Sequence, residues 1–229
     1  MENKTFPFAE RFKAPQGEGL FAGTVMAFAR LVGCSVGKGV CTMCDTDYSE
    51  TRRELGGGLF TADEILDWAE DCQHLCLTGG EPLDRDVRPI LAAAFLRGVM
   101  VHIETSGTRN PSWLRRASAS WNVVFDDGSI LHMGDRLWVT VSPKPGYLED
   151  MVVSADEVKV INGGLGDGPG WPTLSDAVCW ANMGKLVYLQ PANAIREISF
   201  ENLQSCISAV LSNPNLRISV QMHKFWKTR

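Results

Sequence analysis

Three of the seven cysteines stand close together in one short stretch, GCSVGKGVCTMCDT (33–46), at Cys34, Cys41 and Cys44. Cysteines spaced this tightly outside a secreted protein indicate a metal site or redox chemistry. A structural zinc site is closed by four protein ligands, whereas three thiolates on an iron–sulfur cluster leave one iron for a substrate or a cofactor. The stretch therefore predicts either a closed zinc site or a cluster with an open position. Three residues could complete the zinc site, namely Asp45, Cys72 and His74.

A second stretch, TGGEP (78–82), offers main-chain groups at a tight turn, and its glycines would let the backbone approach a ligand closely. Alone, it fits an ordinary strand-to-helix turn equally well. Its place one structural unit after the cysteine loop favours an enzyme. The other four cysteines, Cys72, Cys76, Cys179 and Cys206, are interpreted as small buried apolar residues, with Cys76 in a strand and the rest in helices.

Composition describes an ordinary globular protein. The chain has 229 residues, 45% of them apolar and 21% charged, which is enough for one domain over 1–229 with a full core. The net charge of −5 argues against a nucleic-acid partner. No apolar run approaches the length of a membrane span, and the first residues lack the apolar stretch of a secretory signal. These features predict a cytoplasmic protein that binds neither membrane nor nucleic acid.

Short strands alternate with amphipathic helices along most of the chain, which predicts a mainly parallel sheet covered by helices. Strands, some with their following turns, are predicted over 24–34, 74–80, 99–107, 136–146, 156–163, 186–191 and 217–223. Helices are predicted after a cap at Thr61 and over 88–98, 111–118, 173–184 and 199–211. A hairpin-like insertion is expected over 122–135, and a surface loop over 163–172.

Polar and glycine-rich groups cluster just after several of these strands, in GC, TGGEP, ETSGT, SPKPG and LQPAN. An open doubly wound sheet and a full or partial (β/α) barrel both fit the alternation. In a barrel these groups would converge on the carboxyl face, where barrel enzymes keep their active sites. The pattern favours a single α/β domain with a large composite pocket on that rim.

The spacing Cys34-x6-Cys41-x2-Cys44, followed by Gly79-Gly80-Glu81-Pro82, resembles the radical S-adenosylmethionine (SAM) enzymes. The resemblance implies a partial or modified (β/α) barrel and a [4Fe–4S] cluster whose unique iron chelates SAM. Reduction of the cluster would then give methionine and a 5′-deoxyadenosyl radical. The first gap, SVGKGV, is three residues longer than the superfamily's commonest spacing, and Gly37 and Gly39 make a longer loop sterically easy.

From about residue 6 to the end, the chain is similar to the 7-carboxy-7-deazaguanine synthases. The segments that carry the similarity are QGEG, CDTDY, CLTGGEPL, HIETSGT, VSPKPG, DEVKVI, YLQP and RISVQMHKFW. This resemblance implies a carbon–nitrogen lyase of queuosine and deazapurine biosynthesis. It would convert 6-carboxy-5,6,7,8-tetrahydropterin to 7-carboxy-7-deazaguanine with loss of ammonia. A flavodoxin- or ferredoxin-like electron donor, Mg²⁺ and a homodimer are implied as well.

The resemblance also implies a set of substrate-binding residues. They are Pro15, Gln16, Gly17, Glu18, Arg30, Thr78, His223 and Arg229. An acidic acceptor such as Glu18 suits ring N–H donors. His223 has an alternative interpretation as a structural histidine of the last strand. Arg229 would act through its terminal carboxylate, so a C-terminal tag should impair turnover.

The cofactor residues implied in the same way fall into three groups. Cys34, Cys41 and Cys44 would bind the cluster, and Thr46 would bind Mg²⁺ with support from Asp45 and Asp47. SAM contacts are expected from Met43, Asp45, Gly79, Gly80, Glu81, Glu104, Ser106, Ser142, Pro143, Lys144, Gln190, Pro191, Ala192 and Asn193.

Two rival functions are separable on sequence. A glycyl-radical enzyme activase shares the cluster loop and GGEP, but it has no use for QGEG, Thr46 or VQMHK. A non-catalytic iron–sulfur or zinc protein would leave GGEP, SPK and LQP without a role, and it would not bind SAM.

Overall fold

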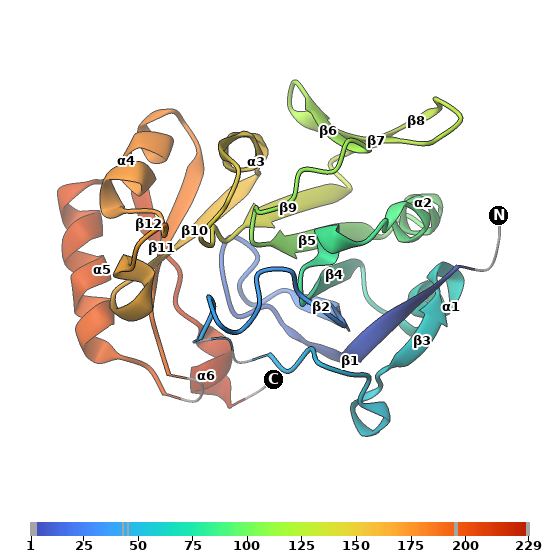
Figure 1. Ribbon diagram of the computed structural model, residues 1–229, viewed down its shortest axis with the longest axis horizontal. Helices are drawn as coiled ribbons and strands as arrows, with labels where there is room; N and C mark the ends of the chain where they lie inside the picture. The colour runs from blue at the N-terminus through green and yellow to red at the C-terminus, as the bar shows by residue number, and fades with distance from the viewer. Residues whose placement is uncertain (1–3, 43, 45, 195–196, 228–229) are drawn as a thin grey trace.

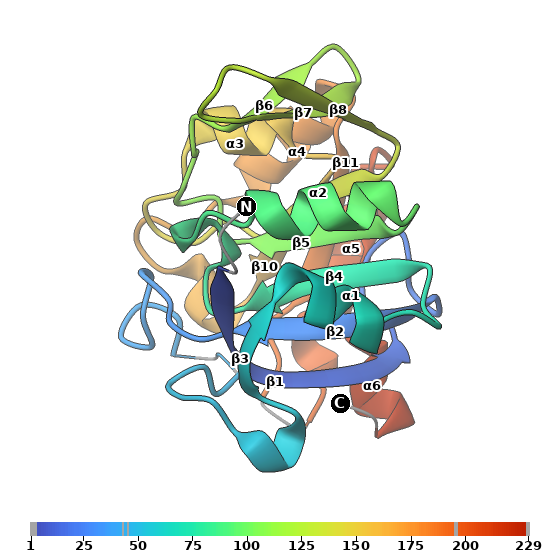
Figure 2. The ribbon, with the colours of Figure 1, turned by 90° about the vertical axis from the view of Figure 1, so that its right-hand side faces the viewer.

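The computed structural model describes residues 4–42, 44, 46–194 and 197–227 (Figures 1 and 2). Its centre is a nine-stranded sheet in the order β12-β11-β10-β9-β5-β4-β2-β1-β3. The strands of this sheet are β1 (Thr5–Pro15), β2 (Val25–Leu31), β3 (Gly58–Thr61), β4 (His74–Gly79), β5 (Met100–Thr105), β9 (Leu137–Val141), β10 (Glu157–Asn162), β11 (Leu186–Pro191) and β12 (Leu216–Ile218).

In this sheet, each pair of neighbouring strands between β2 at one end and β12 at the other is parallel. β1 runs antiparallel to both β2 and β3. Figure 1 shows the sheet as an arc with the helices α1 to α5 along its outer side. The predicted α/β architecture, a mainly parallel sheet in a partial barrel, is confirmed. Because parallel strands share their direction, their carboxyl ends meet at one rim.

The helices are α1 (Ala62–Trp68), α2 (Arg88–Leu96), α3 (Glu149–Ser154), α4 (Leu174–Asn182), α5 (Phe200–Ser212) and α6 (Met222–Trp226), with short 3-10 turns at Arg53–Leu55, Pro82–Asp84 and Gly164–Asp167. Thr61 caps α1 in a capping box with Glu64, as predicted, and Thr173 does the same for α4 with Asp176. Within the described residues no helix is long and apolar enough to cross a membrane.

Side chains alternate between the two faces of the arc, as the period of a strand requires. Those on the outer face are apolar and join the helices in one large core, for example Leu75 and Leu77 on β4 with Ile90 and Leu91 on α2. The residues between them face the inside of the arc and include the buried polar groups His102, Thr140, Lys159 and Gln190 and the half-buried Glu104. The polar site therefore lies inside the arc, and the core that supports it lies outside.

Two predicted elements are wrong, and one strand was not predicted. Residues 111–118 are not a helix, because Leu114–Ala117 forms strand β6 of a separate antiparallel sheet with β7 (Ser120–Val124) and β8 (Ile130–Gly134). The last strand ends at Ile218, and His223 lies on α6. The strand predicted over 24–34 is confirmed as β2, but it is preceded by β1, which was not predicted. The hairpin expected over 122–135 belongs to the β6–β8 sheet, and the predicted loop 163–172 contains a 3-10 turn.

The prediction that the four isolated cysteines are buried apolar residues is confirmed for three of them. Cys76 is fully buried on β4 and Cys206 on α5. Cys72 is buried too, but in the turn after α1 and not in a helix. Cys179 is exposed on α4, so it is not a core residue.

The β6–β8 sheet is tied to the main sheet through the carboxylate of Asp156. This group accepts hydrogen bonds from the Trp121 indole and the Val139 amide, both at 2.8 Å, and forms an ion pair with Arg116. Asp156→Ala removes the acceptor of all three donors and leaves the partly buried Arg116 guanidinium without its carboxylate, so we expect a loss of about 3 kcal/mol of unfolding free energy. Urea unfolding measures it. The exposed Asp135→Ala should stay within about 0.5 kcal/mol of wild type.

The amino-terminal end of the arc is filled by the β1–β2 loop, which also carries Gln16 and Glu18. Phe21 of this loop packs edge-on against His102 and Trp138, with ring centroids 4.6 and 5.2 Å away. His74 Nδ1 lies 2.9 Å from His102 Nε2. Phe21, His74, His102 and Trp138 form an aromatic plug that holds the loop inside the arc. The polar residues of the loop can therefore reach the site.

The plug predicts a stability loss in acid. Burial, with a smaller contribution from His74, lowers the pKa of His102 to about 3. In the unfolded chain the pKa of this histidine is near 6.5, so between pH 6.5 and 3 the unfolded state binds more protons than the folded state. The stability is therefore highest above pH 6.5 and falls as the pH decreases. We expect this histidine to cost about 2 kcal/mol of unfolding free energy between pH 6.5 and 4.5. Urea unfolding at both pH values measures the loss. His102→Gln should reduce it, and the exposed His132→Gln should not.

Candidate active site

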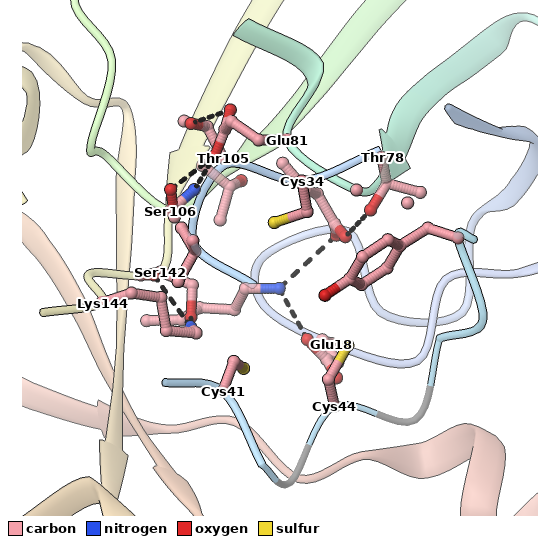
Figure 3. Close-up of a pocket in the computed structure, with 17 residues that line it drawn as sticks. Glu18, Cys34, Cys41, Cys44, Thr78, Glu81, Thr105, Ser106, Ser142 and Lys144 are labelled. Carbon is pink, nitrogen blue, oxygen red and sulfur yellow. Dashed lines mark hydrogen bonds and ion pairs between the residues drawn. The ribbon is translucent and has the colours of Figure 1, made fainter. Parts of the chain in front are cut away.

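Two adjoining cavities open at the carboxyl ends of the parallel strands. The first, the cysteine cavity (Figure 3), is lined by Glu18, Cys34, Val36, Cys41, Cys44, Tyr48, Thr78, Gly79, Gly80, Glu81, Glu104, Thr105, Ser106, Thr140, Ser142, Lys144 and Lys159. The second, the arginine cavity, is lined by Phe12, Pro15, Gln16, Gly17, Glu18, Phe28, Arg30, Thr46, Thr78, Glu104, Gln221 and His223. Glu18, Thr78 and Glu104 line both and form their common wall.

The three clustered cysteines face the cysteine cavity from different sides (Figure 3). Cys34 follows β2, and Cys41 and Cys44 come from the loop after it. A single zinc ion needs its thiolates about 2.3 Å from the metal, and no three His, Cys, Asp or Glu side chains among the described residues are placed to hold one ion. A cluster can bind each thiolate at a different iron. The donor set therefore suits a cluster better than one ion.

Two of the three candidates for a fourth zinc ligand lie at the wrong end of the sheet. Cys72 precedes β4 and His74 is its first residue, whereas the cysteine cavity is lined by Thr78 and Gly79 at the other end of the strand. Five residue steps of a strand span about 16 Å. Neither Cys72 nor His74 can therefore reach the three thiols, and the prediction that one of them completes a zinc site is wrong. Asp45, the third candidate, lies outside the described residues.

The glycines of the GGEP turn serve close packing of the chain on itself. The amides of Gly80 and Glu81 donate to the carbonyls of Leu31 and Gly33, both at 3.0 Å. A Cβ atom built on Gly80 would lie 1.6 Å from the Gly33 oxygen. The turn is thereby fastened beside Cys34, so it shapes the cysteine cavity and brings its own main chain to the cavity wall.

Glu81 binds the neighbouring strand rather than pointing freely into the cavity. Its carboxylate accepts hydrogen bonds from the Thr105 hydroxyl at 2.6 Å, the Ser106 amide at 2.8 Å and the Leu83 amide at 3.0 Å, and also from the Ser106 hydroxyl. The side chain is 1% exposed. Glu81 and Ser106 line the cavity as predicted, but their side chains hold the ends of β4 and β5 together.

Lys144 brings a positive charge to the cavity from the SPK segment. Its ammonium donates to the Ser142 carbonyl at 2.9 Å and to the Ser142 hydroxyl at 2.8 Å. Burial lowers the pKa of Lys144, and a nearby Cys41 thiolate would counteract that effect. Ser142 and Lys144 therefore lie where the sequence predicted. Pro143, between them, is buried and does not line either cavity.

The QPAN segment at the end of β11 lies one layer behind the cavities, because none of its four residues lines them. Gln190 donates to Glu18 at 3.3 Å, and Asn193 donates to Gln221 at 3.1 Å. Pro191 and Ala192 are buried. These residues orient side chains of the arginine cavity, and their predicted direct contact with SAM stays a prediction.

The predicted substrate residues gather as expected. Pro15, Gln16, Gly17, Glu18, Arg30, Thr78 and His223 all line the arginine cavity. Arg30 lies beside Glu10, with Nε and Oε1 3.2 Å apart, and its guanidinium donates to the Thr46 hydroxyl. Thr46 therefore faces the same cavity, which places the predicted Mg²⁺ ligand beside the predicted substrate residues. Three further predicted residues, Met43, Asp45 and Arg229, lie outside the described residues.

Sequence reasoning missed several cavity-lining residues, among them Tyr48 and Lys159. Tyr48 lines the cysteine cavity, and its hydroxyl is buried with no hydrogen-bond partner among the described residues. Burial raises its pKa to about 12. Lys159 lies inside the arc between Glu18 and Glu104. A charged residue within the apolar strand EVKVI was the available signal for Lys159.

The chain was compared with known proteins. No family model matches it. A curated 7-carboxy-7-deazaguanine synthase from Bradyrhizobium diazoefficiens is 29% identical, and the alignment covers 96% of this chain and 97% of the relative. The proteins of the same name from Escherichia coli K12 and from Synechocystis are 28% and 29% identical, covering 96% and 98% of this chain and 97% and 94% of theirs.

A solved structure has the same fold. The crystal structure of QueE from Escherichia coli superposes with a TM-score of 0.66 at 24% identity and covers 95% of this chain and 94% of the other. The curated relatives align over nearly their whole length, and the cysteine loop, the GGEP turn and the QGEG segment meet around one pair of cavities. In sequence and in fold the chain is thus similar to the 7-carboxy-7-deazaguanine synthases over nearly its whole length.

Proposed function

We propose that this protein is a 7-carboxy-7-deazaguanine synthase of the radical SAM class. It converts 6-carboxy-5,6,7,8-tetrahydropterin to 7-carboxy-7-deazaguanine, with loss of ammonia, on the route to queuosine and related deazapurines. The observation that carries the proposal is the pair of adjoining cavities. Three thiols line one cavity, an arginine and several amide and carboxylate groups line the other, and the two share a wall.

The cysteine cavity has the donors that a [4Fe–4S] cluster and SAM require. Cys34, Cys41 and Cys44 would hold the cluster. The main chain at Gly79 and Gly80, with Ser142 and Lys144 across the cavity, would bind the amino acid part of SAM. When bound, this group supplies one-electron chemistry that abstracts hydrogen from a substrate. The protein's part is to orient the two ligands and to keep water out.

The arginine cavity suits a flat heterocycle that carries a carboxylate. The guanidinium of Arg30 would pair with the carboxylate, as arginine does in planar two-point contacts. The Gln16 amide and the Glu18 carboxylate would accept ring N–H groups. Phe12 and Phe28, whose rings stack at 5.1 Å, give the cavity an apolar wall. Thr46 would bind Mg²⁺ together with oxygens of the substrate and water.

The proposal extends to two partners implied by the resemblance, a second copy of the chain and a flavodoxin- or ferredoxin-like electron donor. Lys38, half-exposed on the cysteine loop, supports the second, because a cation beside the cluster would attract an acidic carrier.

The test is an anaerobic assay. The cluster is reconstituted, and the protein is incubated with reductant, SAM and 6-carboxytetrahydropterin, with and without Mg²⁺, while products are followed by mass. We expect 7-carboxy-7-deazaguanine, more of it with Mg²⁺, and SAM that is not consumed. Slow formation of 5′-deoxyadenosine with the pterin unchanged would sink the substrate assignment, and failure to bind iron would sink the enzyme class.

A further inference from the structure

Lys159 occupies the wall between the two cavities. Its ammonium lies 2.6 Å from Glu18 Oε2 and 3.4 Å from Glu104 Oε1, and its side chain is 5% exposed. Glu18 comes from the β1–β2 loop and Glu104 from β5, so one lysine on β10 joins three distant parts of the chain. Lys159 lines the cysteine cavity, and both carboxylates line the two cavities together.

Neutral donors complete the arrangement around the two carboxylates. Glu104 also accepts from Gln16 and Thr78, both at 3.1 Å. Glu18 also accepts from Gln221 at 2.9 Å and from Gln190 at 3.3 Å. None of these amides or hydroxyls carries a charge that could balance a carboxylate. Among the described residues, Lys159 thus forms ion pairs with both carboxylates.

Other charged groups stand farther from Lys159 or turn away from it. Glu157, two residues along β10, directs its carboxylate to the Leu20 amide at 2.8 Å. Lys144 lies across the cysteine cavity, and Arg30 and His223 line the arginine cavity. Cys76 is buried on β4, also inside the arc. These groups modulate the local potential, but the two ion pairs set it.

We propose that Lys159 is a positioning residue that keeps Glu18 and Glu104 side by side as two charged hydrogen-bond acceptors for the substrate. This inference rests on the proposed function, because a reduced pterin offers the N–H donors that such acceptors would receive. Without the lysine, two carboxylates would share one buried site, and one of them would take up a proton. A protonated carboxyl donates where the substrate also donates, so binding would weaken.

The electrostatics of the site support positioning over proton transfer. Burial alone would raise the pKa of Glu18, but attraction to Lys159, hydrogen bonds from Lys159 and Gln221 and a smaller attraction to His223 together lower it to about 2. The two carboxylates in turn raise the pKa of Lys159 although burial opposes this. A lysine whose pKa lies above its usual value is a poor proton donor at neutral pH.

Lys159→Met tests the inference, because methionine keeps most of the length and removes the charge. KM and kcat for the pterin are measured from pH 6 to 9 in the cluster-loaded enzyme, with iron content and pterin-free cleavage of SAM as checks on loading. We expect the wild-type KM to be flat over this range. In Lys159→Met we expect KM to be at least tenfold higher at pH 7 and to recover as the pH rises and the shared proton leaves. Lys185→Met, outside both cavities, should match wild type.

An unchanged KM in Lys159→Met, or a lower kcat with a flat KM profile, would overturn the inference. If Lys159→Met does not fold or does not bind the cluster, a double variant of Lys159→Met and Glu104→Gln takes its place. Glu104→Gln removes the repulsion between the two carboxylates, so the double variant should fold and its KM should not depend on pH. A KM that still rises in acid in the double variant would also overturn it. No turnover by wild type would sink the proposed function, whereas turnover by wild type with an unchanged Lys159→Met would sink only this inference.

Discussion

Gly80→Ala is expected to lose both stability and iron binding. The added methyl carbon would lie 1.6 Å from the Gly33 oxygen and 2.4 Å from its carbonyl carbon. These are backbone atoms, so no side chain can move aside, and the turn itself must shift. Its two hydrogen bonds to Leu31 and Gly33 would then lengthen or break. We expect a loss of about 3 kcal/mol of unfolding free energy or more.

The iron loss follows from where the clash occurs. Gly33 directly precedes Cys34, so a displaced turn moves the first thiol away from the other two. Urea unfolding of the metal-free protein and iron content after anaerobic reconstitution measure the two effects separately. Gly39→Ala is the matched control, because a Cβ there meets nothing within 4 Å in the same cysteine loop. A Gly80→Ala variant with the stability and iron content of wild type would contradict this account of the turn.

The parallel half of the fold could be predicted because its strands carry strong local signals. Strands such as β4 and β11 are short apolar runs that end in glycine or proline turns, and each is followed by a helical pattern. The antiparallel strand β1 could not be predicted in this way. Its segment, TFPFAERFKAP, contains two prolines and mixes buried with half-exposed positions. Proline argues against a sheet strand on sequence alone, and only pairing with β2 and β3 overrides that.

The error at residues 111–118 has a similar physical origin. Pro111 and Ser112 look like a helix start, and the arginines that follow are good helix formers. Pairing with β7 decides the conformation instead, since Leu114 is buried opposite the buried Val123. Propensity is a weak preference, and such a contact depends on a turn that the pattern does not reveal.

In the candidate site too, residues placed by local signals could be predicted and residues placed by distant contacts could not. Residues that stand within a few positions of a strand end, such as Cys34 and Ser142, could be placed at the rim because the topology brings strand ends together. Lys159 could not, because it stands within its strand and its partner Glu18 is 141 residues away. Glu81 was placed at the right cavity, but its four hydrogen bonds to Leu83, Thr105 and Ser106 depend on how β4 and β5 meet.

Replacing a cluster cysteine is the other change with a large expected effect. Cys34 and Cys41 face the cavity from different sides (Figure 3) and make no contact with the apolar core. Cys41→Ala leaves two protein thiols for a cluster that the family resemblance assigns to three. We expect iron after reconstitution to fall to less than a tenth of wild type and the visible absorption of the cluster to be lost.

The same variant should fold normally, which separates loss of the metal from loss of structure. Cys41 is partly exposed and lies outside the helices and strands, so we expect the metal-free variant to unfold within about 1 kcal/mol of metal-free wild type. Cys179→Ala, at an exposed thiol on α4, should keep full iron content. If Cys41→Ala retained the cluster while Cys179→Ala lost it, the cysteine cavity would not be the metal site. Because Lys159 and the two carboxylates form the far wall of that cavity, the assignment of the substrate to the arginine cavity would then fail as well.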